Sequence, residues 1–299
     1  MVAISGNKVV VTGADGFIGS YLSRLLEIPQ EHQVDSKKGT DQNLINPVVA
    51  DKYIEGADIV IHLAAISGLA ACDRDKDVAH TYNVKATENV VNACIKNRVR
   101  RLIFASTSAI YGETTQFIIN EDHPTSPRST YGENKLEAEK LVINSGRNWI
   151  VFRQSNIYGY GIQNKGITVI DSFIERYLKK EPIMITGPGI QKRDFLHLVD
   201  LGRAYRQAVN LPFIRSGIYN LGSGQTISIR ELAYLVNDIG ESIFGYRVPY
   251  ETKEGAWGAG WHDFRYDCSR ARMEFQWEPT WTLDDYLKEA LLSGFRKVA

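Results

Sequence analysis

A tyrosine and a lysine four positions apart form the residue pair in this chain best suited to acid–base chemistry. Tyr131 and Lys135 lie in a stretch whose pattern predicts a helix, and a spacing of four places both side chains on one helix face. A lysine ammonium beside a phenol favours the phenolate and lowers the pKa of the phenol. The pair therefore predicts a group that takes a proton from a substrate hydroxyl and returns it.

Hydroxyl side chains end the apolar run that precedes this pair. The run beginning at Arg100 leads into Ser106, Thr107 and Ser108, and we predict it to be a strand. The carboxyl end of a strand in a parallel sheet faces the ligand site, so these hydroxyls are candidates for ligand contacts. Serine and threonine are also ordinary loop residues, and the pattern alone leaves their role open.

A glycine-rich turn near the N-terminus predicts a dinucleotide site. Residues 9–11 are three valines, as in a strand buried on both faces, and a helical pattern begins at Ile18. Between them, Gly13 permits a sharp turn, Gly16 lets backbone N–H groups approach a pyrophosphate, and Gly19 lets the helix pack closely on the strand. The helix N-terminus adds partial positive charge for the phosphates.

An acidic residue at the end of the second predicted strand bears on the choice of dinucleotide. Asp35 lies 16 residues beyond Gly19, near the distance at which a carboxylate reaches the adenosine ribose. It favours NAD over NADP because it would repel a 2′-phosphate. Lys37 and Lys38 act in the opposite direction and leave the choice open.

The third predicted strand ends in small and apolar residues where a cofactor is expected to cross the sheet. The apolar run that starts after Asp58 contains His62, which we interpret as a hydrogen-bonded structural residue. The candidate cofactor contacts are Leu63, Ala64 and Ala65.

The elements that must position these residues alternate between strands and helices. This order predicts an α/β fold, a Rossmann-type doubly wound parallel sheet with a smaller α/β substrate-binding lobe. The sequence texture changes near residue 160, where shorter patterns and more glycine and proline begin. We predict a dinucleotide-binding domain over 1–160, with elements from about 190–225 returning to it, and a substrate-binding lobe mainly over 161–299.

Composition restricts the partners. The chain has 299 residues, 43% of them hydrophobic, and 35 basic side chains balance 35 acidic ones. No global field is present to hold nucleic acid or an anionic membrane, so a small charged ligand bound locally is expected. The three cysteines match no metal spacing, and no metal site is expected. Without a leader-like segment or a long apolar run, we expect a soluble, cytoplasmic protein.

Several segments in order carry a resemblance to a known family. They are Thr12-Gly-Ala-Asp-Gly-Phe-Ile-Gly19, His62-Leu-Ala-Ala65, Asn83-Val-Lys-Ala-Thr, Ser106-Thr-Ser-Ala-Ile-Tyr-Gly112, Tyr131-x-x-x-Lys135, Arg153-Gln-Ser-Asn-Ile-Tyr-Gly159, Arg193-Asp-Phe-x-His and Tyr219-Asn-Leu-Gly-Ser-Gly. With them the chain resembles the extended short-chain dehydrogenase/reductases, specifically the NAD-dependent epimerase/dehydratase family, which acts on nucleotide-linked sugars.

The resemblance implies roles for individual residues. Tyr131 would be the acid/base, Lys135 its electrostatic partner and a contact of the nicotinamide ribose, and Thr107 the hydrogen-bond partner of the reacting sugar oxygen. Further cofactor contacts would be Phe17, Ile18, Asn83 and Ser106, with Asp41 as an adenine-side candidate. The substrate diphosphate would be bound by Asn156 and Arg193, with Arg265 as a further candidate. The resemblance also implies a homodimer.

One departure from the family bears on the reaction. Sugar-nucleotide 4,6-dehydratases have Asp and Glu directly after the threonine, whereas this chain has Ser108 and Ala109, which cannot perform that acid–base work. The leading interpretation is an NAD-dependent epimerase acting at C4 of a nucleotide-diphosphate hexose, with a UDP-sugar favoured. The alternatives are an NAD(P)H-dependent 4-ketoreductase of a nucleotide-linked deoxysugar and a non-catalytic dinucleotide-binding protein.

Overall fold

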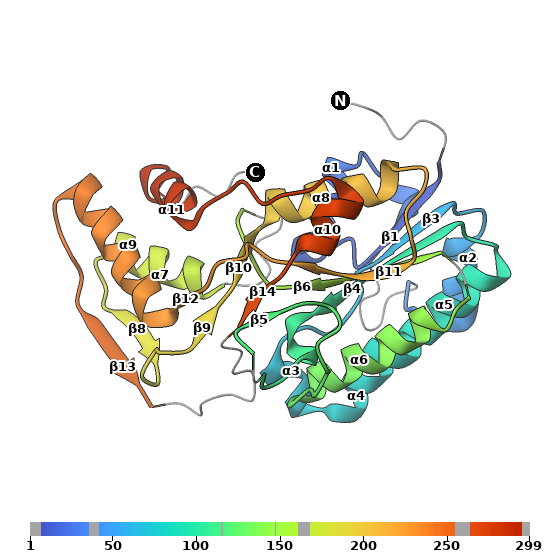
Figure 1. Ribbon diagram of the computed structural model, residues 1–299, viewed down its shortest axis with the longest axis horizontal. Helices are drawn as coiled ribbons and strands as arrows, with labels where there is room; N and C mark the ends of the chain where they lie inside the picture. Colours follow the sequence, from blue (N-terminus) through green and yellow to red (C-terminus); the bar gives the residue numbers. More distant parts are fainter. Residues whose placement is uncertain are drawn as a thin grey trace.

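A six-stranded parallel sheet forms the centre of the fold (Figure 1). The computed structural model describes residues 7–35, 42–114, 116–146, 148–160, 168–254 and 264–294. From one edge to the other, the strands are β11 (Gly217–Leu221), β6 (Trp149–Gln154), β4 (Arg101–Thr107), β3 (Ile59–His62), β1 (Val9–Thr12) and β2 (Gln33–Val34). Each neighbouring pair is parallel, which confirms the predicted doubly wound sheet.

The valine run in β1 shows why the strands are apolar on both faces. Val9 and Val11 belong to one core and Val10 to another, because successive side chains of a strand point to opposite faces. The first core also holds the helices α1 (Phe17–Leu25), α8 (Leu198–Asn210) and α10 (Ser269–Phe275), and the second holds α2 (Pro47–Ile54), α5 (Ala86–Lys96) and α6 (Thr130–Ile143).

A run of helical segments leads from the third strand to the fourth. It comprises α3 (Leu69–Arg74), α4 (Lys76–His80), the π-helical turn η2 (Thr81–Lys85) and α5. The sequence predicts one helix over about 75–97, and the structure interrupts it with the wider π turn. Such turns often occur at functional sites, and Tyr82 of η2 lines the cavity described below.

A third hydrophobic core lies to one side of the sheet (Figure 1). It is built by α7 (Val169–Leu178), α9 (Ile229–Phe244) and α11 (Leu283–Leu292) with the parallel pair β8 (Ile183–Thr186) and β13 (Tyr250–Lys253). Thr168 and Ser228 cap α7 and α9 in capping boxes, which satisfy N–H groups at the helix starts.

Further short strand pairs lie outside the six-stranded sheet. They are β7 (Asn156–Tyr158) with β10 (Phe195–His197), β9 (Lys192–Arg193) with β12 (Ile227–Ser228), and β5 (Ile118–Ile119) with β14 (Arg265–Tyr266). The remaining elements are the 3₁₀ turns η1 (Gln30–His32) and η3 (Ser108–Ile110). The division of the chain near residue 160 stays a prediction.

A buried arginine joins an early strand to a late helix. The Arg101 side chain, at the start of β4, donates to the carbonyl oxygens of Ala208 at 2.6 Å and Leu211 at 2.9 Å, at the C-terminal end of α8. A cation in this place satisfies carbonyls that have no partner within the helix. Within the described residues, no helix has the length and apolarity that crossing a membrane requires.

Candidate active site

The glycine turn between β1 and α1 is closely packed against the next strand. Gly13 has φ +72°, a conformation that favours glycine, and its N–H donates to Val34 O at 2.7 Å. A Cβ at Gly13 would lie 2.8 Å from Ala64 N, and one at Gly19 would lie 2.0 Å from Gly13 O. Because neither position has room for a side chain, both glycines are needed for the close packing of this turn.

A cavity of about 590 Å³ opens along this turn and the carboxyl ends of the strands. Its volume lies in the range of small-ligand sites, about 300–1,000 Å³. The predicted residues that line it are Gly13, Gly16, Phe17, Ile18, Gly19, Asp35, Leu63, Ala64, Ala65, Ser106, Tyr131 and Lys135. One continuous cavity thus joins the glycine turn to the tyrosine and lysine.

Tyr131 stands at the start of α6, facing the end of β4. Ser129 caps this helix by accepting from Gly132 N at 3.1 Å, which fixes where α6 begins. The Tyr131 phenol lies beside the side chain of Thr107. The pKa of Tyr131 is raised to about 12, mainly by burial and also by the nearby Cys72, while the polar contact with Thr107 acts to lower it.

Lys135 lies one helical turn further along, beneath the aromatic ring of Phe104. Only 3% of the residue is exposed, and its Nζ stands 4.1 Å from the ring centroid. Burial lowers the pKa of Lys135 to about 7, against the opposing charge of Glu139. Burial therefore dominates the pKa of both groups in the chain alone, and the electrostatic role of Lys135 towards Tyr131 stays a prediction.

Asn83, a predicted cofactor contact, lies behind the cavity wall. It is buried, and its side-chain amide accepts from Ile66 N at 2.7 Å and donates to Ile66 O at 3.1 Å. Ile66 lines the cavity, whereas Asn83 is absent from the described lining, as is Thr107. Asn83 thus holds the cavity wall from behind.

His62 is a structural residue, as predicted. Its Nδ1 lies 2.7 Å from Thr12 Oγ1 and its Nε2 lies 2.9 Å from Thr87 Oγ1. Burial, with a contribution from the charge of Lys135, lowers the pKa of His62 to about 3. The imidazole is therefore neutral at physiological pH.

Several polar residues of the cavity lining were not predicted from the sequence, and Gln154 and Thr168 are two of them. Gln154 ends β6 and Thr168 caps α7, and both line the cavity. The strand-end rule that indicated Ser106 applies equally to Gln154. The Thr-x-x-Asp capping pattern could have placed Thr168 at a helix start, but not beside the cavity.

A second cavity, of only about 10 Å³, lies beside two of the three predicted diphosphate-binding residues, Asn156 and Arg193. It is lined by Ser108, Ser155, Asn156, Arg193, Asp194, Phe264 and Tyr266. The Asp194 carboxylate holds the neighbouring turn by accepting from Ser223 N at 2.7 Å and Gly224 N at 3.0 Å. Arg265 is not among the described lining residues, because alternation along β14 turns it away from the face of Phe264 and Tyr266.

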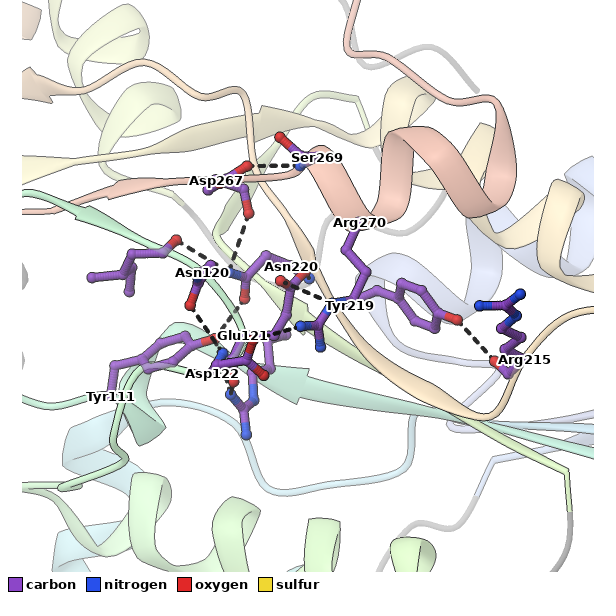
Figure 2. Close-up of polar contacts among 12 residues, drawn as sticks. Tyr111, Asn120, Glu121, Asp122, Arg215, Tyr219, Asn220, Asp267, Ser269 and Arg270 are labelled. Carbon is purple, nitrogen blue, oxygen red and sulfur yellow. Dashed lines mark hydrogen bonds and ion pairs between the residues drawn. The ribbon is translucent and has the colours of Figure 1, made fainter.

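The pair β5 and β14, which carries the wall of this small cavity, is anchored by buried polar contacts (Figure 2). The Glu121 carboxylate accepts from Asn220 N at 2.7 Å, and Tyr111 donates to Asn220 Oδ1 at 2.7 Å. Asn220 Nδ2 donates to the carbonyls of Ile119 and Asp267, each at 3.4 Å. The end of β11 is therefore tied to both short strands.

Comparison with known proteins identifies the family. Residues 9–222 match the model of the NAD dependent epimerase/dehydratase family, a segment that contains the glycine turn and the Tyr131–Lys135 pair. The chain belongs to this family. Membership confirms the predicted family and NAD as the cofactor. The glycine turn, where a Cβ would collide with backbone, fits the close approach of the NAD pyrophosphate.

Individual relatives extend over most of the chain. It is 30% identical to a putative UDP-glucose 4-epimerase of Methanocaldococcus jannaschii, over 85% of this chain and 92% of that one. The UDP-glucose 4-epimerase of Thermotoga maritima, solved with UDP-glucose, is similar with a TM-score of 0.83 and 27% identity, covering 97% of this chain and 98% of that one. The UDP-glucuronic acid 4-epimerase of Bacillus cereus, solved with UDP-glucuronic acid and NAD, has a TM-score of 0.81 and 26% identity, with coverage of 97% and 99%.

The match across the full sheet confirms the Rossmann-type fold. The remaining sequence candidates near the adenine side, Asp41, Lys37 and Lys38, lie outside the described residues.

Proposed function

We propose that this chain is an NAD-dependent epimerase that inverts C4 of a nucleotide-diphosphate hexose, with a UDP-sugar as substrate. The observation that carries the proposal is the position of Tyr131: it lies beside Thr107 and one helical turn from Lys135, and it lines the same cavity as the glycine turn. The names of the similar proteins, UDP-glucose 4-epimerase among them, support the substrate class.

In this proposal the chain's own residues move one proton. Tyr131 accepts the proton of the C4 hydroxyl and later returns it, while Thr107 hydrogen-bonds the same sugar oxygen. Lys135 binds the nicotinamide ribose, and its ammonium stabilises the phenolate. NAD, when bound, supplies a hydride acceptor and a positive charge beside the phenol.

In this proposal the substrate is held through its diphosphate by two residues that line the small cavity. Asn156 and Arg193 bind the diphosphate, because a guanidinium can donate parallel hydrogen bonds to phosphate oxygens. With the diphosphate held, the 4-keto sugar can turn and present its other face. Arg265, on the opposite side of β14, is a weaker candidate for this contact. Ser108 and Ala109 supply no acid–base group for dehydration.

The experiment follows conversion of UDP-glucose, UDP-GlcNAc and their 4-epimers by NMR. We expect interconversion of one epimeric pair, and a Tyr131→Phe variant slower by about 10²–10⁴-fold. Tyr234→Phe is the control, because Tyr234 is exposed on α9, away from both cavities. Equal turnover by Tyr131→Phe would contradict the assignment. Net oxidation of NADPH by a 4-keto sugar nucleotide would indicate a ketoreductase instead.

We propose in addition that the protein is a homodimer, as the resemblance implies, paired through α5 and α6. Analytical ultracentrifugation tests this, and a monomer at micromolar concentration would contradict it.

A further inference from the structure

A buried carboxylate completes one face of the helix that carries the tyrosine and lysine. Tyr131, Lys135 and Glu139 follow one another at intervals of four along α6, so their side chains share that face. Only 1% of Glu139 is exposed. A charged residue at such a position requires strong partners, because a buried charge is costly unless it is paired.

Glu139 is held by both strands that face the helix. Arg153 of β6 donates through Nη2 to Glu139 Oε1 at 2.6 Å, and Ser106 of β4 donates to Glu139 Oε2 at 2.8 Å. Arg153 in turn donates to the Tyr111 hydroxyl at 3.0 Å and to Glu121 O at 2.9 Å. The carboxylate therefore has a fixed position relative to the sheet.

Ser106 connects this buried pair to the cavity. It lines the cavity beside Lys135 and Tyr131 and directly precedes Thr107. Glu139 thus lies behind Lys135, one helical turn away from the cavity. An apolar side chain at this position would stabilise the core equally well. The presence of a buried carboxylate therefore indicates a role for its charge.

We propose that Glu139 is a positioning residue, which keeps the Lys135 side chain protonated and aligned with Tyr131. The inference rests on the role of Lys135 in the proposed function. Lys135 stands in an apolar environment against Phe104, where burial favours the neutral amine, and a carboxylate one turn away opposes that preference. A neutral Lys135 could no longer stabilise the phenolate.

The other groups around Lys135 cannot replace this charge. His62 of β3 is neutral, since its pKa is held at about 3, and burial raises the pKa of the Cys72 thiol of α3. The further titratable side chains that share this cavity or its wall are Asp15 of the glycine turn, Asp35 after β2, Tyr82 of η2, Tyr131 of α6 and Arg153 of β6. Among the described residues facing the lysine from α6 and the sheet, Glu139 supplies the negative charge.

A direct test measures the titration of Lys135 by NMR in lysine-labelled protein as purified, with the signal assigned through Lys135→Arg. In Glu139→Gln, which keeps the shape of the side chain without its charge, we expect Lys135 to titrate about one pH unit lower or more. Glu139→Asp, which retains the charge, should restore most of the difference. An unchanged Lys135 titration in Glu139→Gln would overturn the proposal.

Tyr111→Phe is the matched control. It removes the hydroxyl that binds Arg153 and leaves Glu139 in place, so it disturbs the same buried cluster without changing the charge behind Lys135. We expect the Lys135 titration to stay at its wild-type pH. An equal shift in Tyr111→Phe would show that loosened packing is responsible and would overturn the proposal. If Glu139→Gln does not fold, Glu139→Gln/Arg153→Gln avoids an unpaired guanidinium. A smaller lowering is expected there, because a positive charge is removed as well, and no lowering would overturn the proposal.

Turnover supplies the second readout. With a UDP-hexose as substrate, Glu139→Gln should move the alkaline limb of the kcat profile to lower pH by about the same amount, with KM unchanged. A shifted Lys135 titration in a chain that epimerises no nucleotide sugar overturns the proposed function and supports the role of Glu139 towards Lys135. If the chain is an active epimerase and Glu139→Gln changes neither the Lys135 titration nor the kcat profile, the role of Glu139 alone is overturned.

Discussion

The side-chain amide of Asn83 binds both backbone polar groups of Ile66, accepting at 2.7 Å and donating at 3.1 Å. It thereby fixes the loop after β3, which forms one wall of the large cavity. We predict that Asn83→Ala weakens NAD binding by about tenfold or more, because the loop loses two buried hydrogen bonds. Isothermal titration with NAD on protein stripped of cofactor measures this.

The chain offers a matched control for this variant. Asn237 in α9 makes the same pair of contacts with Val248, both at 2.9 Å, in the third core. Asn237→Ala should cost similar stability and leave NAD affinity unchanged. Equal losses of NAD affinity in both variants would assign the effect to general destabilisation.

The glycine turn predicts a graded response to added methyl groups. A Cβ at Gly19 would lie 2.0 Å from Gly13 O, whereas one at Gly16 would lie 3.2 Å from the same atom. Gly19→Ala should therefore lower the free energy of unfolding by about 3 kcal/mol through overpacking. Gly16→Ala should fold with nearly wild-type stability, and it should bind NAD more weakly than the wild type does. Urea denaturation and NAD titration of both variants check this, and similar stability of the two would contradict the packing argument.

Features that depend on local pattern were predictable from the sequence. The strand before the glycine turn, the helix after it and the common face of Tyr131 and Lys135 follow from periodicity and spacing. The roles of Asn83 and Glu139 were not, because their partners are set by tertiary packing. Glu139 lies among charged residues in a helix, a pattern typical of a solvated face, and only the arrival of β6 beside α6 buries it with Arg153.

The buried, neutral imidazole of His62 predicts that the stability of the chain depends on pH. The pKa of His62 is about 3 in the folded chain against 6.5 as its ordinary value, so between these values the unfolded chain binds the additional proton. The free energy of unfolding should therefore fall as the pH drops below 6.5, by about 1.4 kcal/mol per unit from this residue.

Comparison of variants isolates that contribution from other groups that titrate in the same range. Between pH 6.5 and 5, His62→Gln should lose about 2 kcal/mol less than the wild type, measured by urea denaturation. Asn237→Ala, which is destabilised but keeps His62, should retain the wild-type slope. Parallel slopes for His62→Gln and wild type would refute the prediction.

The polar contacts beside the small cavity predict unequal effects for two adjacent acids (Figure 2). Glu121→Ala leaves the buried Asn220 N–H without its acceptor and should lower the free energy of unfolding by about 2 kcal/mol. Asp122 binds Arg270 at 2.8 Å with 74% of its side chain exposed, so Asp122→Ala should change stability by less than about 1 kcal/mol. Thermal denaturation of both variants decides, and a larger loss for Asp122→Ala would be inconsistent with this arrangement.

The bond from Arg101 to the carbonyls at the end of α8 has a consequence for synthesis on the ribosome. A nascent chain that ends near residue 160 already contains Arg101 and β6, but neither α8 nor β11 has been made. The guanidinium then has no carbonyl partners, and β6 presents an unpaired edge of the kind that recruits foreign strands. The dinucleotide half should therefore mature only after the chain has passed Leu221, and a fragment released at residue 160 should aggregate.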